Sequence, residues 1–431
     1  MKVTIDRWIY GGAGAGRDAA GDAAAGAVLL VPFTMPKEVI EATVPAGSSP
    51  VRNGELVKIL DASPERVAAR CAHFGTCGGC QYQHATYETQ VRLKLGILLK
   101  IFETAGLGAV PEPQVHTGAP WEYRNRIRLR VGMADGALRV GYNRRGSYEM
   151  LPIRECPIAA SLLMRAAEAM LTVVAKTTEL SAWTKQIVEV ELFTDRDQSQ
   201  LQMTFYLKAE RRSELTAFCK QMTTIVPELV GAGVIVVGDS GRREQPGARW
   251  GADGIKYHAA GREYWVSRGS FFQVNRSLVD ELVRIVTAGR GGALAWDLYA
   301  GVGLFSRVLI ETFAAVTGVE TVVDDLRAVL KVSGGRAVGA TVAAFLRDAV
   351  LQRERPDLIV MDPPRAGLGP DVCELLGRVK AREMVYVSCD PVTLARDLST
   401  VVDSGYTINA VHMVDLFPQT FHMETIVVLN R

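Results

Sequence analysis

The stretch of this chain with the clearest chemical content ends at Cys389. An apolar run typical of a β-strand, residues 385–388, leads into this cysteine, and a run compatible with a helix follows at 393–398. In open α/β sheets, ligands bind at the carboxyl ends of the strands. A thiol at such a place is a candidate nucleophile. The alternative is a structural thiol, since free cysteine is among the most buried residue types.

A second group of cysteines has the spacing of a metal site. Cys71, Cys77 and Cys80 fall within ten residues, and the two glycines before Cys80 let the backbone fold tightly. The nearest later candidate for a fourth ligand is Cys156. Four thiolates suit zinc or an iron–sulfur cluster, and the spacing alone does not choose between them.

Positive charge is concentrated in one segment of an otherwise balanced chain. The net charge is +2 over 431 residues, whereas residues 124–154 hold eight arginines and only two acidic residues. Alternation with apolar residues predicts a strand in which four arginines share one face: Arg124, Arg126, Arg128 and Arg130. A row of guanidiniums backed by an apolar face suits contact with phosphates. The alternative is a solvated strand face with local ion pairs.

The C-terminal part of the chain, from residue 271, alternates between strand-like and helix-like runs. This alternation predicts a doubly wound, Rossmann-like α/β sheet. The parallel strands are expected at 294–299, 316–320, 340–345, 358–361 and 385–388. Two further β-rich runs, 406–414 and 425–429, close the chain.

The first two of these strands end in groups that suit a nucleoside. Gly301 and Gly303 form a Gly-x-Gly turn that lets the backbone approach a ligand, and Glu320 could accept both hydroxyls of a ribose. This pairing serves NAD, FAD or S-adenosylmethionine (AdoMet). Ser306 stands where the dinucleotide fingerprint would have its third glycine, so no pyrophosphate site is required and AdoMet is favoured.

Two more acids complete the expected ligand site. Asp348, after the third expected strand, could bond the adenine amino group. Asp362 opens an Asp-Pro-Pro sequence after the fourth strand, where the transferring methyl group and its acceptor would meet.

The N-terminal residues 1–70 contain several short strand-like runs separated by Gly, Pro and Ser, which predicts a small β-barrel of the oligonucleotide-binding kind. The Gly/Ala-rich segment 11–26 is expected to be a loop, and residues 86–103 have the apolar spacing of a helix. We therefore expect a barrel at 1–70, a mixed α+β domain at 71–270 that carries the four cysteines, and an α/β domain at 271–431.

Three motifs in the C-terminal part together resemble the RNA 5-methyluridine methyltransferases. They are Asp362-Pro363-Pro364-Arg365, Ser388-Cys389-Asp390-Pro391 and His422-Met423-Glu424-Thr425. Residues 1–70 resemble the TRAM domain of this family, and the four cysteines match its [4Fe-4S] motif. The branch with both features chiefly modifies 23S ribosomal RNA, whereas the branch acting on the transfer RNA T-loop usually lacks them. The chain is therefore similar to the 23S rRNA (uracil-5-)-methyltransferases.

The resemblance implies a role for each matching position. Cys389 is the expected nucleophile and Glu424 the expected base. The expected AdoMet contacts are Gln273, Tyr299, Glu320, Asp348 and Asp362. Independently of the resemblance, the arginine pattern of the strand makes Arg124, Arg126, Arg128 and Arg130 the expected RNA contacts, and Arg365 is expected to join them. Thiolate addition to C6 of uracil would make C5 nucleophilic, and a base would then remove the C5 proton.

Several alternatives stay open at this point. His422 is a rival base, and a transfer RNA is a rival substrate. Asp-Pro-Pro also serves methylation of exocyclic amino groups, although Arg365 replaces the aromatic residue that usually follows it. A function that is not enzymatic is also open: the protein could be a non-catalytic RNA-binding factor in ribosome assembly. The chain has no uninterrupted apolar stretch long enough to span a bilayer. We expect a cytoplasmic monomer that makes no membrane contact.

Overall fold

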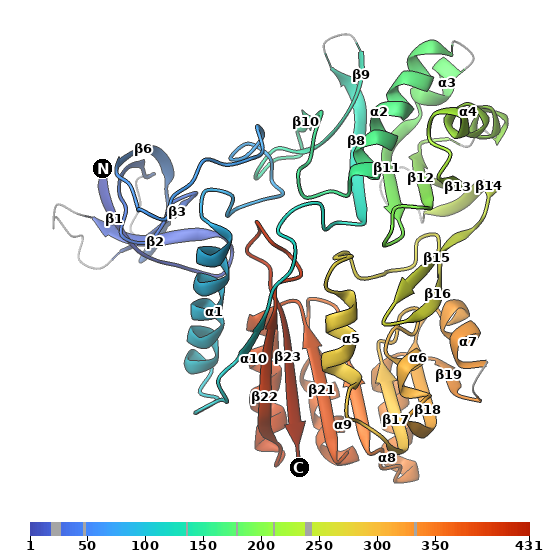
Figure 1. Ribbon diagram of the computed structural model, residues 1–431. Helices are drawn as coiled ribbons and strands as arrows, with labels where there is room; N and C mark the ends of the chain where they lie inside the picture. Colours follow the sequence, from blue (N-terminus) through green and yellow to red (C-terminus); the bar gives the residue numbers. More distant parts are fainter. Residues whose placement is uncertain are drawn as a thin grey trace.

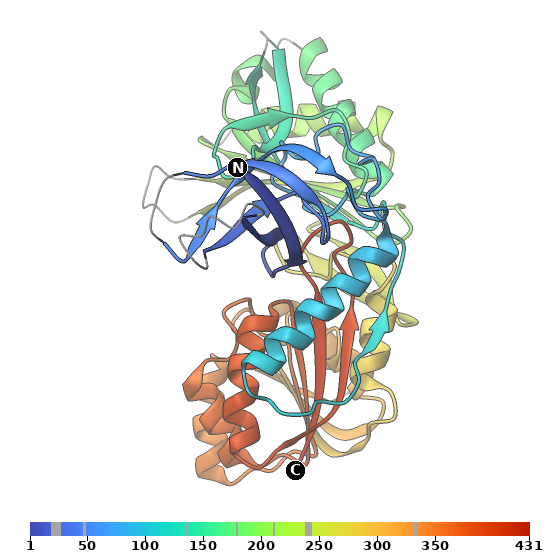
Figure 2. The same cartoon turned by 90° about the vertical axis from the view of Figure 1, so that its left-hand side faces the viewer.

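The computed structural model describes residues 1–18, 27–45, 49–134, 137–177, 180–209, 212–237, 244–331 and 334–431. Three main sheets follow one another along the chain (Figure 1). Figure 1 shows the N-terminal sheet to the left of the middle sheet, and Figure 2 shows the C-terminal sheet below both. No helix in the described ranges is long and apolar enough to cross a membrane.

The N-terminal sheet is curved and has the strand order β5-β3-β2-β1-β4-β6. Its strands are β1 (Lys2–Trp8), β2 (Ala13–Asp18), β3 (Val28–Pro32), β4 (Val39–Thr43), β5 (Val51–Asn53) and β6 (Glu55–Asp61). The predicted strand-rich N-terminus is confirmed, but the expected loop is wrong over residues 13–18, which form β2. A Cβ at Gly14 would lie 2.2 Å from Thr34 Oγ1, so glycine is what lets this strand pack closely. Residues 19–26 of that segment lie outside the described residues.

The middle sheet has the strand order β10-β9-β8-β11-β12-β13-β14. Its strands are β8 (Arg126–Ala134), β9 (Ala137–Asn143), β10 (Met150–Pro152), β11 (Ile187–Thr194), β12 (Leu201–Leu207), β13 (Leu229–Val236) and β14 (Gln245–Gly251). Helices α2 (Ser161–Lys176), α3 (Ser181–Thr184) and α4 (Arg212–Ile225) belong to this part of the chain. The apolar faces of α2 and α4 share one hydrophobic core with the sheet. A hairpin of β15 (Gly254–Ala259) and β16 (Arg262–Ser267) follows.

The C-terminal sheet has the order β19-β18-β17-β20-β21-β23-β22-β7, and its first five strands are parallel. The strands are β17 (Gly292–Leu298), β18 (Phe313–Glu320), β19 (Arg336–Gly339), β20 (Leu358–Met361), β21 (Glu383–Ser388), β22 (Thr407–Val414), β23 (Glu424–Asn430) and, from earlier in the chain, β7 (Gln114–His116). Residues of α8 (Val342–Gln352), α9 (Pro370–Val379) and α10 (Pro391–Asp403) share one core with the sheet. Residues of α5 (Val279–Thr287), α6 (Ser306–Leu309) and α7 (Asp324–Lys331) share another. The predicted doubly wound α/β fold is confirmed.

One predicted strand of this sheet is wrong. Residues 340–345, expected to be the third strand, begin helix α8, and the strand in that position is β19, just before them. Thr341 caps the helix, because its side chain accepts a hydrogen bond from the backbone N–H of Ala344. The apolar residues after Thr341 are therefore the buried face of a helix.

Two elements from the expected middle domain pack on the C-terminal sheet. Helix α1 (Tyr87–Thr104) confirms the predicted helix, and its buried residues join the core of the C-terminal sheet. Strand β7 (Gln114–His116) pairs with β22 at the edge of that sheet. Figure 2 shows α1 running from the N-terminal sheet down across the C-terminal part. The domain boundaries stay a prediction, but residues 87–116 pack with the C-terminal sheet.

Candidate active site

The pairing of β21 with β23 brings Cys389 beside Glu424. These strands are antiparallel, and the last recorded pair of the ladder is Ser388 with Thr425. One further step along the same register sets Cys389 opposite Glu424. Cys389 is partly exposed, whereas Glu424 is only 3% exposed. Two residues that are 35 positions apart thus meet at one end of the sheet.

Three of the expected AdoMet contacts end neighbouring strands at the same edge. Leu298 pairs with Val319 and with Met361, so the next residues along, Tyr299, Glu320 and Asp362, reach the same level of the sheet. Gln273 approaches from outside the sheet, and its Nε2 donates to Asp362 Oδ2 at 3.2 Å. These four residues and Cys389 therefore line one end of the parallel sheet, where ligands bind in such folds.

Asp348 is not at this edge. It lies exposed on α8, because the strand expected before it is a helix. The strand end next to Glu320 holds Ala340 instead, whose backbone N–H donates to Glu320 O at 3.2 Å. The expectation that Asp348 follows a strand is wrong, and its position on the helix gives the adenine contact no support.

The acids around Cys389 have raised proton affinities. Burial, followed by the nearby Asp362 carboxylate, raises the pKa of Glu424 well above its ordinary value, and Arg365 opposes this shift. Burial and Asp297 together raise the pKa of Asp362 to about 7. A raised pKa makes each of these carboxylates, once ionised, a stronger base than an ordinary carboxylate.

Asp297 supports the turn that follows β17. Its Oδ2 accepts hydrogen bonds from Ser306 N at 2.8 Å and from Ser306 Oγ at 2.5 Å. The residue is completely buried, and this burial raises its pKa to about 6. The turn between these two residues includes Tyr299, whose φ of 61° lies in the left-handed region. Asp297 therefore fixes a strained turn directly beside the expected ligand site.

The thiol of Cys389 is protonated at neutral pH in the free protein. Burial is the largest cause, and the Glu424 and Asp362 carboxylates add to it, so the pKa of Cys389 rises to about 12. We expect the rate of Cys389 alkylation by iodoacetamide to rise about tenfold per pH unit, without a plateau, up to about pH 10, because the thiolate is the reactive form. Peptide mass spectrometry after timed quenching measures this rate for Cys389 alone.

The denatured protein supplies the control for this alkylation series. There Cys389 has an ordinary thiol pKa, and its rate should level off above about pH 9. A plateau at or below neutral pH in the folded protein would contradict the expected protonation state.

The loop that leads into Glu424 is fixed by helix α1. Lys94 is fully buried, and its Nζ donates to Asp415 Oδ1 at 2.7 Å and to the carbonyl oxygens of Phe417 and His422. Gln90 Nε2 donates to Gln419 Oε1 at 3.0 Å. Breaking one partner of a buried ion pair costs about 3–5 kcal/mol. This loop is therefore held rigidly in front of β23.

The N-terminal sheet also reaches the site. Tyr10, just after β1, donates through its hydroxyl to Asp390 Oδ2 at 3.1 Å. The other oxygen of Asp390 accepts from Val392 N and Thr393 N and so caps α10. Tyr10 also packs edge to face on Phe421, with ring centroids 5.3 Å apart. No local pattern in the sequence marked Tyr10, because its partner is 380 residues away.

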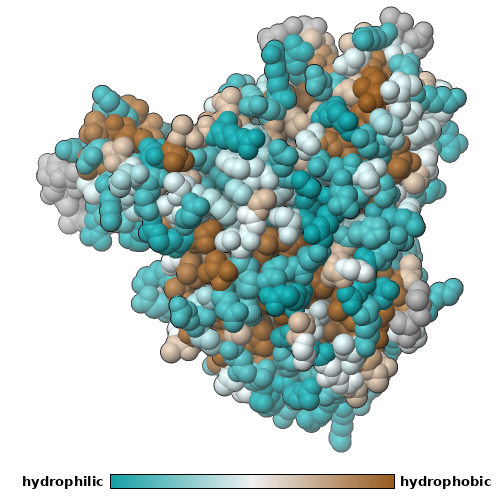
Figure 3. Space-filling view, in the orientation of Figure 1, coloured by the Kyte–Doolittle hydropathy of each residue, from teal (hydrophilic) through white to brown (hydrophobic). Residues whose placement is uncertain are grey.

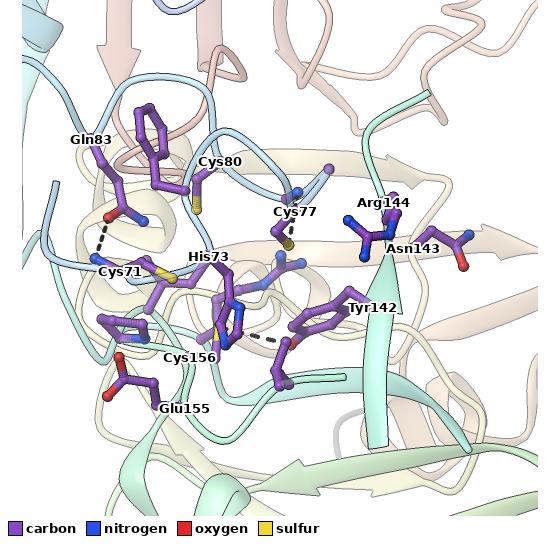
Figure 4. A pocket seen from close by; sticks show the side chains of 17 residues that line it. Cys71, His73, Cys77, Cys80, Gln83, Tyr142, Asn143, Arg144, Glu155 and Cys156 are labelled. Atoms are coloured by element: carbon purple, nitrogen blue, oxygen red, sulfur yellow. Dashed lines mark hydrogen bonds between the residues drawn. The ribbon is translucent and has the colours of Figure 1, made fainter. Parts of the chain in front are cut away.

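The four expected metal ligands face one cavity of about 310 Å³. Figure 4 shows the sulfur atoms of Cys71, Cys77, Cys80 and Cys156 directed into this space. Burial raises the pKa of Cys80 to about 12, and the other three thiols add to the shift. In the described part of the chain, no three His, Cys, Asp or Glu side chains lie close enough to hold a single metal ion.

The four-cysteine segment touches the loop before Glu424. The backbone N–H groups of Gln81 and Tyr82, which follow Cys80, both donate to Gln419 O at 3.0 Å. The segment that would hold a metal centre is thus bonded directly to the loop that leads to the candidate base.

Some arginines of the expected row are already bound to other side chains of the protein and are therefore not free to contact RNA. Strand β8 carries three of them on one face, as predicted, with Ile127, Leu129 and Val131 buried on the other. Arg126 stacks on Phe193, with 4.0 Å from its guanidinium carbon to the ring centroid. Arg128 stacks on Tyr206 and pairs with Glu189 at 2.5 Å.

The remaining two arginines of the expected RNA contacts lie near the two candidate centres. Arg124 lies before β8 and lines the four-cysteine cavity. Arg365 Nη2 lies 3.2 Å from His422 Nε2, beside Glu424.

Comparison with known proteins identifies the family. A family model described as tRNA (Uracil-5-)-methyltransferase matches residues 339–431. An uncharacterized RNA methyltransferase of Aquifex aeolicus is 30% identical, over 100% of this chain and 98% of its own length. A 23S rRNA (uracil(1939)-C(5))-methyltransferase of Chromohalobacter salexigens is 29% identical, over 100% of this chain and 89% of its own length. The chain belongs to the RNA methyltransferase family of these relatives, and its C-terminal residues match the (uracil-5-)-methyltransferase model.

The fold of this RNA methyltransferase also matches a solved structure from end to end. The tRNA (uracil-54, C5)-methyltransferase of Pyrococcus abyssi, solved with S-adenosyl-L-homocysteine, superposes with a TM-score of 0.76 at 24% identity and covers 100% of both chains. The three-part architecture therefore also occurs in a protein named as a transfer RNA enzyme. Architecture alone does not favour ribosomal RNA over transfer RNA for this methyltransferase.

Proposed function

We propose that this RNA methyltransferase transfers the methyl group of AdoMet to C5 of a uridine in RNA. We propose 23S rRNA as the substrate. The observation that carries the proposal is the register of β21 and β23, whose last pair is Ser388 with Thr425, so that Cys389 and Glu424 are the next residues on the two strands. A nucleophile and a base at one end of the sheet are the two groups that methylation of uracil C5 requires. An exocyclic amino group would need neither.

Each of the two side chains has one chemical task. Cys389 first loses its thiol proton to solvent, and the thiolate then adds to C6 of uracil. The electron pair of the C5–C6 double bond moves to give an enolate that is nucleophilic at C5. AdoMet, when bound, supplies the methyl group that C5 accepts. Glu424 then takes the C5 proton, the C5–C6 double bond forms again, and the thiolate of Cys389 leaves.

The residues at the strand ends suit AdoMet. Glu320 Oε2 already accepts from Gly301 N at 3.1 Å, which holds its carboxylate beside the turn where a ribose would lie. Tyr299 offers a half-buried aromatic face next to it. Gln273 and Asp362, hydrogen-bonded to each other, stand between this turn and Cys389. We assign these four residues to AdoMet and make no such assignment for Asp348.

The choice of 23S rRNA rests on the relative from Chromohalobacter salexigens, which bears that activity in its name. Transfer RNA is the alternative substrate, because the solved structure with the same architecture is named as a transfer RNA enzyme. Arg365, beside the active site, is the arginine we place nearest the reacting nucleotide. Among the other expected RNA contacts, Arg130 makes one long hydrogen bond, of 3.4 Å to Asn143.

The proposal is tested by the product. Wild-type protein is incubated with unmodified 23S rRNA or unmodified transfer RNA transcripts and radiolabelled AdoMet, and the RNA is digested to nucleosides for mass spectrometry. We expect 5-methyluridine, formed faster on 23S rRNA. A methyl group on an exocyclic nitrogen would instead indicate an amino methyltransferase. RNA binding without AdoMet binding in calorimetry would indicate a non-catalytic assembly factor.

We further propose that the four cysteines hold a [4Fe-4S] cluster. Such a cluster needs four thiolates spread around a space larger than one ion occupies. A cavity of about 310 Å³ with all four sulfur atoms at its wall suits this group. The cluster would fix the segment bonded to Gln419.

The cluster gives a separate prediction. Protein purified without oxygen is expected to show broad visible absorption and about four iron and four sulfide per chain. Cys77→Ser should lose both signals, because one of the four ligands is gone, whereas the buried Cys219→Ala, outside the cavity, should keep them. One zinc per chain with no visible absorption would contradict the assignment.

A further inference from the structure

A cavity outside the two described centres lies where the N-terminal sheet, α1 and α10 meet. Its volume is about 560 Å³. Tyr10 and Val392 are both in its wall, and Val392 comes three residues after Cys389. Tyr10 donates to Asp390, the residue after Cys389, so the wall of the cavity is bonded to the segment that carries the candidate nucleophile. Figure 1 shows α1 between the N-terminal sheet and α10.

The wall of this cavity is apolar, with cations and without acids. Its apolar part comes from β1, the segment after it, α1 and α10, and includes Ile9, Leu93, Ile97, Ile101 and Ala395. Arg7, Lys100 and Arg396 also line it, and none of its described lining residues carries a carboxylate. In the space-filling view, hydrophobic side chains are exposed just below the N-terminal sheet, in the region where Figure 1 places α1 (Figure 3).

The cations remain available to an anionic ligand. Lys100 and Arg396 are partnered on their own helices by Glu103 at 2.9 Å and by Asp397 at 2.8 Å. Their side chains are nevertheless 65% and 51% exposed. The Lys100–Glu103 pair is exposed on both sides and is therefore worth little, so a phosphate can replace the Glu103 carboxylate at small cost. Arg396 stays paired with Asp397, which is buried, and the exposed half of its side chain is open to a ligand.

Gly96 gives an independent sign that this space is kept open. It lies in the middle of α1 and lines the cavity, although glycine is a poorer helix former than alanine. A Cβ at this position would meet no atom within 4 Å, so neither packing nor backbone approach requires glycine here. A side chain at residue 96 would extend into the cavity and fill part of it.

We infer that this cavity binds an unpaired nucleotide of the substrate RNA adjacent to the uridine that reaches Cys389. The inference rests on the proposed function, in which RNA is the substrate. A base moved out of its stack leaves its neighbours exposed, and proteins bind such bases on apolar surfaces with cations at the backbone. Cavities of about 300–1,000 Å³ enclose ligands of this size. The apolar wall takes the base, and Arg7, Lys100 and Arg396 face the phosphates.

The test fills the cavity and compares it with a matched surface change. Gly96→Phe places a ring in the cavity, and Leu99→Phe enlarges a residue of the same helix that is 39% exposed and does not line it. The probes are unmodified 23S rRNA and transfer RNA transcripts. We expect Gly96→Phe to raise the Kd for the RNA that wild type binds about tenfold, in the range of one lost base-stacking contact. Leu99→Phe should stay within about twofold of wild type, and all three proteins should bind AdoMet equally.

A second readout locates the nucleotide. RNA carrying 4-thiouridine should crosslink to peptides containing Tyr10 or residues 93–104 in wild type and Leu99→Phe, and not in Gly96→Phe. If Gly96→Phe does not fold, the exposed double variant Arg7→Ala/Lys100→Ala replaces it. That variant should lower the slope of log Kd against log salt by about one per lost phosphate contact.

The outcomes separate this inference from the proposed function. Equal Kd values and equal crosslinks in Gly96→Phe and Leu99→Phe overturn the cavity assignment, even where wild type forms 5-methyluridine. Crosslinks and a Kd effect at the cavity without any 5-methyluridine overturn the proposed function and leave the cavity as an RNA site.

Discussion

Cys389→Ala is expected to lower the rate of 5-methyluridine formation by at least about a thousandfold, because the covalent step is lost. Single-turnover assays with radiolabelled AdoMet and the RNA that wild type methylates measure the loss. The affinity for AdoMet in calorimetry should stay within about threefold, since the strand-end residues are unchanged.

The matched control for this change is Cys219→Ala. Cys219 is a buried thiol of α4 in the middle sheet's core, far in sequence and fold from the site. This variant should lose some thermal stability and keep the wild-type rate. If Cys389→Ala methylates at the wild-type rate, Cys389 is a structural thiol. Methylation of an exocyclic amino group at Asp362-Pro363-Pro364 would then be the better supported function.

Glu424→Gln is expected to accumulate a covalent protein–RNA adduct that survives denaturing gels. The thiolate can still add and C5 can still accept the methyl group, but the carboxylate assigned to take the C5 proton is gone, so elimination slows. Turnover should fall about 10²–10⁴-fold, the usual contribution of a general base. The adduct is measured by gel shift of labelled RNA and by the mass of the crosslinked peptide.

Two further variants sharpen this result. Cys389→Ala/Glu424→Gln should form no adduct, because the bond is made by Cys389. His422→Gln should turn over within about tenfold of wild type. Burial and Arg365 lower the pKa of His422 to about 4, which makes it a weak base. An adduct that accumulates in His422→Gln and not in Glu424→Gln would reverse the two roles.

Local sequence pattern predicted the elements that carry the chemistry. The apolar run before Cys389 is β21, and the residues after it are α10, capped by Asp390. Helix α1 begins at Tyr87, directly after the cap at Thr86. These elements follow from side-chain alternation and capping within a few residues. The pattern gave a wrong prediction at residues 340–345, because the apolar residues after Thr341 are compatible with either a strand or a helix. The helix forms there because Thr341 caps its N-terminus.

The sequence by itself therefore determined the α/β class, the position of Cys389 at a strand end and the grouping of Cys71, Cys77 and Cys80. The tertiary structure alone decided which distant residues meet. The β21–β23 register sets Glu424 beside Cys389, α1 fixes the loop before it through Lys94, and Tyr10 reaches Asp390. The tertiary structure also raises the pKa values of Cys389 and Glu424, because it buries both groups and places carboxylates next to them. Neighbours along the chain set local structure, whereas burial and charge at a site depend on contacts between segments that are far apart in the sequence.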